Sequence, residues 1–116
     1  MKAVLNTDFA LEMLGGEKTL LKELLVSYMN DTPFDAEKVR KFAAEGKNTE
    51  GAGYVHYYKG SARQIGAEQL AEAGQNLEDV LRGKKSGDIP SLAAAFEDCY
   101  KTAVSAMKSW VSSSED

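Results

Sequence analysis

Residues 55–67 read VHYYKGSARQIGA and include the only histidine of the chain, His56. The stretch has helical periodicity: at about 100° per residue, Tyr58, Ala62 and Ile65 point to one side and His56 points nearly the opposite way. The sequence therefore predicts a helix that presents a lone imidazole on a cleared, basic, outward face. The residues that share this face are Ala52, Gly53, Lys59, Gly60 and Arg63.

Gly53 and Gly60 flank the histidine on this face. A glycine inside a helix costs roughly 1 kcal/mol relative to alanine, so two of them beside one histidine require a reason. Close approach by another molecule is such a reason. Lys59, one turn beyond His56, would meet a negative charge brought to the ring.

The N-terminal half of the chain also shows helical spacing. We expect a short helix over residues 8–14, capped by Thr7 or Asp8 and ended by a Gly-Gly pair. A second, long helix should run from residue 17 to about residue 46 and kink at Pro33. The alternative is two helices with a tight break, because proline removes a backbone hydrogen bond and disfavours helical geometry in the preceding residue. The apolar positions expected to face the core are Leu20, Leu21, Leu24, Leu25, Tyr28, Val39, Phe42 and Ala43.

Three more helices are expected after residue 47. The first is capped by Asn48 or Thr49 and ends or bends at Gly66, the second covers residues 67–82, and the third follows an Asp88 cap. Residues 112–116 should fray. In the last helix, apolar residues alternate three and four apart, which is typical of an antiparallel bundle. They are Leu92, Phe96, Cys99, Ala103, Ala106 and Trp110.

We therefore predict an all-α fold, an antiparallel four-helix bundle with a short additional N-terminal helix, as a single domain over residues 1–116.

The composition, 43% hydrophobic and 28% charged, is that of an ordinary globular protein. A net charge of −4 gives no support to nucleic-acid binding. Cys99 is alone, which excludes an internal disulfide, and we expect it to be a buried, inert thiol. There is no apolar run long enough for a signal peptide or membrane span, so we expect a cytoplasmic protein. We also expect a monomer. The initiating methionine favours a free-standing protein.

A longer pattern combines the features above with residues further along the chain. His56 is followed by Lys59-Gly60, Ile65-Gly66-Ala67, Leu70 and the run Ala73-Gly74-Gln75-Asn76-Leu77-Glu78. This pattern resembles the histidine phosphotransfer (HPt) domains of bacterial multistep phosphorelays, over residues 8–112. The resemblance implies that His56 accepts a phosphoryl group from a receiver-domain aspartyl phosphate, or from a histidine kinase, and passes it to another receiver aspartate.

The chemistry of imidazole suits such a role, because a neutral ring nitrogen is a nucleophile at physiological pH. For Nε2 to attack, Nδ1 must hold the proton, and an acceptor on a neighbouring helix would fix that tautomer. Glu78 is the candidate, since it lies at the flank of the buried stripe of its own helix and the family often carries glutamine or glutamate there. Gln75 should point further out to solvent.

The remaining site residues follow from the facing of the histidine helix and from the resemblance. Lys59 would neutralise part of the phosphoryl charge, while Gly53, Gly60 and Arg63 would contact the partner. Because the receiver supplies the Mg²⁺ in such relays, we expect no metal or cofactor in this chain and no independent enzymatic turnover.

Two other functions are compatible with parts of the pattern. A helical adaptor could bind a receiver or kinase without relaying phosphate, although it would not need the histidine. An enzyme could use His56 as a general base, but it would need a nucleophile or a metal set that the chain does not supply.

Overall fold

The computed structural model describes residues 2–31 and 33–113, which contain six helices and no strand. The predicted all-helical fold class is confirmed. In chain order the helices are α1 (Thr7–Met13), α2 (Lys18–Asn30), α3 (Ala36–Ala44), α4 (Asn48–Gln64), α5 (Glu68–Leu81) and α6 (Ile89–Ser113).

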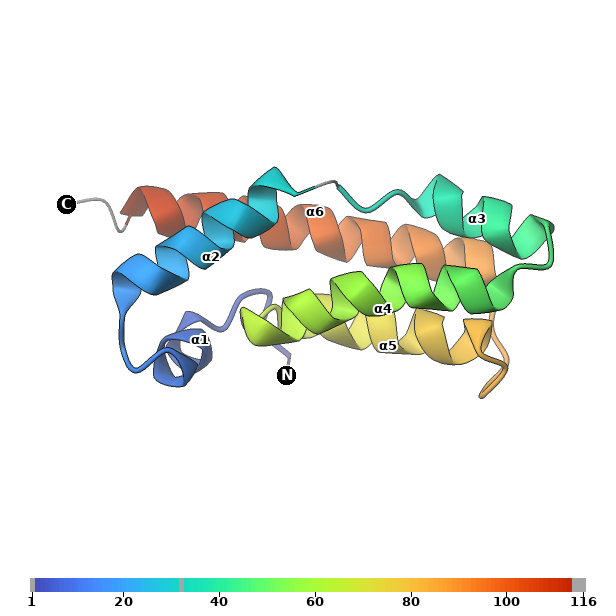
Figure 1. Ribbon diagram of the computed structural model, residues 1–116, viewed down its shortest axis with the longest axis horizontal. Helices are drawn as coiled ribbons and strands as arrows, with labels where there is room; N and C mark the ends of the chain where they lie inside the picture. The colour runs from blue at the N-terminus through green and yellow to red at the C-terminus, as the bar shows by residue number, and fades with distance from the viewer. Residues whose placement is uncertain (1, 32, 114–116) are drawn as a thin grey trace.

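Four of the helices close a ring of contacts. Helix α3 packs on α4, α4 on α5, α5 on α6, and α6 back on α3. Neighbours in this ring run in opposite directions, as Figure 1 shows. Helix α2 packs on the other half of α6, and α1 lies against α2, so the molecule is elongated, 49 × 23 × 20 Å.

The expected long helix from residue 17 to residue 46 is wrong, and the alternative of two helices with a break is right. Helix α2 ends at Asn30 and α3 begins at Ala36. Asp31 is already extended, with φ −71° and ψ 166°, and Pro33 cannot donate a helical hydrogen bond. Phe34 then enters the core, where its ring meets that of Phe96 at 4.5 Å between centroids. The break between α2 and α3 lets this side chain reach the core.

The caps differ in part from the expectation. Asn6, rather than Thr7 or Asp8, caps α1, because its Oδ1 accepts a hydrogen bond from the Phe9 N–H at 3.0 Å. Helix α4 begins at Asn48 itself, after Lys47, with no side-chain cap. Asp88 acts as expected: its Oδ2 accepts a hydrogen bond from the Ser91 N–H at 3.1 Å before the first turn of α6.

The buried stripe of α6 is shifted from the predicted seam. Cys99, Ala106 and Trp110 are only partly buried. A spacing of three and four fits two neighbouring stripes of one helix, and the position of α2 and α5 selects between them. Helix α6 also continues through residues 112 and 113, where fraying was expected, and residues 114–116 lie outside the described residues. The buried positions are Ala93, Phe96, Tyr100, Ala103 and Met107.

Residues 2–6 form an N-terminal strap across the turn between α4 and α5. The Asn6 N–H donates to the Gly66 carbonyl at 2.7 Å, and the Glu68 carboxylate accepts from the Ala3 N–H and the Asn6 side-chain amide, both at 2.9 Å. Gly66 has φ +79°, and a β carbon there would collide with the Asn6 carbonyl. The strap therefore fixes how α4 turns into α5.

Gly74 allows α5 to pack closely against α4 and α6. A β carbon at this position would lie 3.0 Å from both the Lys59 Cβ and the Phe96 Cε1. We expect Gly74→Val to lower the free energy of unfolding by about 1–3 kcal/mol, because the added methyl groups overpack this contact. Denaturant unfolding measures the change, and stability equal to that of the wild type would contradict the close packing.

Candidate functional site

Helix α4 presents His56 to solvent, with 61% of its side chain exposed. Arg63 and Gly53 are also exposed, and Gly60 is half-buried. A β carbon added at Gly53 or Gly60 would meet no heavy atom within 4 Å, so open space surrounds both glycines. The inward residues are those that the periodicity predicted, since Tyr58, Ala62 and Ile65 are buried. The cleared face around the histidine is therefore present.

The acceptor for the imidazole comes from α5, the helix packed against α4. Both carboxylate oxygens of Glu78 lie 3.2 Å from His56 Nδ1. The Glu78 side chain is only 6% exposed, whereas the ring that it contacts is open to solvent. The structure thus places Glu78 where helical facing predicted it, within hydrogen-bond reach of Nδ1.

Lys59 does not point outward, which corrects the expectation from helical facing. It is buried, with its Nζ 2.7 Å from Glu78 Oε1 and 3.1 Å from Gln75 Oε1. Three residues of helix rotate the side chain by about 60° from His56 toward the inner side, and α5 covers that flank. Ala52 is buried on the same flank. Lys59 is therefore a fixed cation on Glu78 rather than a mobile one in solvent.

Two further residues of the cluster were not identified from the sequence. The Arg82 Nε donates to Glu78 Oε2 at 2.8 Å. Gln75, expected to point to solvent, is half-buried, and its Oε1 accepts from Lys59 and, at 2.9 Å, from Arg63. The signal for Arg82 was its position four residues after an acid on one helix, a spacing that favours an ion pair.

The cluster keeps Glu78 ionised. Burial raises the pKa of its carboxyl group, but hydrogen bonds from Lys59, Arg82 and His56, together with the charge of Lys59, lower that pKa to about 2. One carboxylate thus lies between two cations, next to the imidazole ring of His56. On the side of the histidine that α5 covers, the two positive charges of Lys59 and Arg82 outnumber the single negative charge of Glu78.

Tyr57 links the site to the break between α2 and α3. It follows His56 on α4 and is exposed, and its hydroxyl donates to Asp31 Oδ2 at 2.7 Å. This hydrogen bond raises the pKa of the Tyr57 phenol. The contact ties the exposed face of α4 to the C-terminal end of α2.

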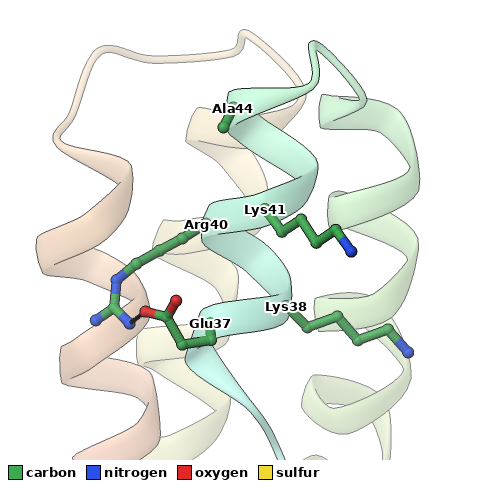
Figure 2. Close-up of a pocket in the computed structure, with 5 residues that line it drawn as sticks. All are labelled: Glu37, Lys38, Arg40, Lys41 and Ala44. Atoms are coloured by element: carbon green, nitrogen blue, oxygen red, sulfur yellow. Dashed lines mark hydrogen bonds and ion pairs between the residues drawn. The ribbon is translucent and has the colours of Figure 1, made fainter.

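The His56 imidazole lies on an open face of α4, exposed to solvent over most of its surface. A shallow depression of about 510 Å³ occurs on α3, but all of its lining residues come from that helix. Figure 2 shows Lys38 and Lys41 extending toward α4 and Arg40 turned away to pair with Glu37. Small ligands usually bind in concave sites, so an imidazole on an open helix face suits a macromolecular partner.

An apolar groove of about 390 Å³ lies next to the histidine face, between α1, α2 and the C-terminal end of α4. Arg63 lines the groove and also lies two helical turns from His56 on the same side of α4. Leu20 and Leu24, expected in the core, are instead exposed. The groove is lined by Phe9, Met13, Leu14, Leu24, Arg63 and Gln64.

Comparison with protein families gives a match to the Hpt domain over residues 23–110 of the 116. The chain belongs to this family, whose members are phosphocarriers of two-component systems and interact with receiver domains and kinases. Comparisons with curated proteins and with solved structures give no match. Among the described residues, no helix combines the length and apolar character needed to cross a membrane.

Proposed function

We propose that His56 is the phosphoryl-carrying residue of this Hpt domain, which accepts the group from a receiver aspartyl phosphate or a kinase and donates it to a receiver aspartate. The observation that supports this most strongly is the pairing of an exposed imidazole with a buried, ionised acceptor at Nδ1. A carboxylate at Nδ1 favours the tautomer whose lone pair is on Nε2.

In the proposed transfer, the Nε2 lone pair attacks the phosphorus atom of the aspartyl phosphate. The bond between phosphorus and the aspartate oxygen breaks, and its electron pair returns to the aspartate carboxylate. The Nδ1 proton stays hydrogen-bonded to Glu78, which stabilises the positive charge that the phosphorylated ring acquires. Donation to a second aspartate reverses these steps, so one geometry serves both directions.

Lys59 acts in this scheme through its position beneath the site. Its Nζ contacts Glu78 rather than open solvent, and its charge still contributes to a positive potential at the site. Such a potential favours approach of an anionic group. The receiver supplies the Mg²⁺ and the acidic pocket that stabilise the transferring group.

We propose that the receiver docks on the face formed by Gly53, His56, Gly60 and Arg63. The open space around both glycines supports this, because it leaves the backbone of α4 accessible beside the ring. The apolar groove shares Arg63 with this face and would be covered by a partner of domain size.

The proposal is tested with purified receiver domains that have been phosphorylated with labelled acetyl phosphate. Label should move to this chain, be lost in acid and be kept in alkali, as for a phosphoramidate, and map to His56 by mass spectrometry. Binding to a receiver without any transfer of label would contradict the proposal and favour an adaptor.

Substitutions at Gly60 separate docking from stability. Gly60→Ala should raise the free energy of unfolding by about 0.5–1 kcal/mol, because alanine is a better helix former and its β carbon meets open space. Phosphotransfer should fall modestly in this variant and by about tenfold or more in Gly60→Leu, whose side chain would obstruct the near-contact geometry that the reaction needs.

A matched control adds the same bulk elsewhere. Ala44 is exposed at the end of α3, so Ala44→Leu should leave transfer unchanged. Thermal unfolding and transfer rates are measured together. Unchanged transfer in Gly60→Leu would place the docking face elsewhere.

A further inference from the structure

We propose that Arg82 is a positioning residue of the phosphotransfer site, which holds the Glu78 carboxylate in the orientation that keeps the proton on His56 Nδ1. This inference rests on the proposed function of His56 and adds a residue from outside the histidine helix. Arg82 follows the last residue of α5 and contacts Glu78 directly.

The geometry around Glu78 is nearly symmetric. Lys59 Nζ lies 2.7 Å from Oε1, Arg82 Nε lies 2.8 Å from Oε2, and His56 Nδ1 lies 3.2 Å from each oxygen. Each oxygen therefore has its own cation, and the imidazole nitrogen faces both. The terminal torsion of a glutamate is broad and only weakly restrained by itself. Two cations on opposite oxygens restrain that torsion more tightly than Lys59 alone would.

The two cations differ in how they are held. Lys59 is 6% exposed and comes from the same helix as the histidine, where it also donates to Gln75. Arg82 is 34% exposed and comes from the end of the opposite helix. An arginine Nε donates in the plane of the guanidinium group, so its hydrogen bond is directional, unlike that of a flexible ammonium group. Arg82 is thus suited to fixing the orientation of the carboxylate.

An ordinary ion pair between exposed residues four apart on a helix contributes little to stability. The Arg82–Glu78 pair differs because its acid is buried and also contacts the ring proposed to react. Arg82 itself is partly exposed, so its removal should cost the bundle little stability. Because Glu78 contacts the imidazole, the same removal should have a larger effect on the tautomer of His56.

The tautomer can be measured without a partner. Because His56 is the only histidine, ¹⁵N NMR of the full chain gives a single pair of ring-nitrogen shifts, which report the Nδ1–H and Nε2–H populations of the neutral ring. The wild type should be mainly Nδ1–H, and Glu78→Ala should shift the ring toward Nε2–H. Arg82→Met should give an intermediate shift and a transfer rate about three- to tenfold below that of the wild type. Arg82→Lys should restore only part of both, because a flexible ammonium group donates a less directional hydrogen bond.

Arg40→Met is the matched control, since Arg40 pairs with Glu37 on the side of α3 that is turned away from α4, the helix of His56 (Figure 2). It should leave tautomer and transfer unchanged. Circular dichroism verifies that each variant is folded, and Arg82→Gln provides a second neutral replacement. A wild-type tautomer in both neutral variants would overturn the inference, as would a wild-type tautomer in Glu78→Ala. Because the tautomer measurement needs no receiver, a wild type that takes no phosphate would contradict the proposed function alone.

Discussion

His56→Gln should abolish phosphoryl acceptance, by at least about 100-fold, while the helical fold is retained, because the amide side chain has no nucleophilic nitrogen. The imidazole is largely exposed, and Glu78 keeps its hydrogen bonds to Lys59 and Arg82 when the ring is removed. The change in the free energy of unfolding should therefore stay within about 0.5 kcal/mol. Label transfer from a phosphorylated receiver and circular dichroism measure the two effects.

Tyr57→Phe is the control for this substitution. Tyr57 is adjacent and exposed, and the variant loses only the hydroxyl that donates to Asp31. It should still accept the label. Substantial label in His56→Gln would mean that another residue carries the phosphoryl group.

Glu78→Gln should lower the free energy of unfolding at neutral pH by about 3 kcal/mol, because it leaves Lys59 buried without its carboxylate partner. The folded-state pKa of Glu78 lies at about 2, below the usual value of 4.5. The ionised carboxylate therefore stabilises the fold at any pH above 4.5, and this contribution is lost as the pH falls from 4.5 to about 2. The stabilities of the wild type and the variant should converge near the acid end of this range.

Urea unfolding at a series of pH values measures this convergence. Glu23→Gln, which changes an exposed glutamate of α2, should show a small difference from the wild type at every pH. A stability difference for Glu78→Gln that stays constant as the pH falls from 4.5 to about 2 would show that ionisation of this carboxylate does not stabilise the fold.

Helical periodicity was sufficient to predict which side of α4 carries the histidine. It placed Tyr58 inside and His56 outside, and it placed Glu78 on the flank of α5 that reaches the ring. It failed for Lys59, because residues within about 60° of the exposed direction are buried or exposed according to which flank the next helix covers. One sequence does not contain that information, since it depends on how α4 and α5 are placed relative to each other.

The same limit applies to the linker at residues 31–35 and to the stripe of α6. Proline indicated a disruption but not its size, which is set by the burial of Phe34 among aromatic rings. The missed local signal was Asp35, whose Oδ1 accepts from the Glu37 N–H at 3.0 Å and starts α3. In α6, two stripes fit the spacing equally well, and only tertiary packing selects between them.

The strap at residues 2–6 lies outside the segment that matches the family, residues 23–110. It is nevertheless hydrogen-bonded to Gly66 and Glu68, in the turn that joins the helix of His56 to the helix of Glu78. The smallest unit that preserves the crossing of these two helices therefore includes the N-terminal residues. In a chimaera that transplants this site into another protein, the strap would have to be transplanted with the bundle.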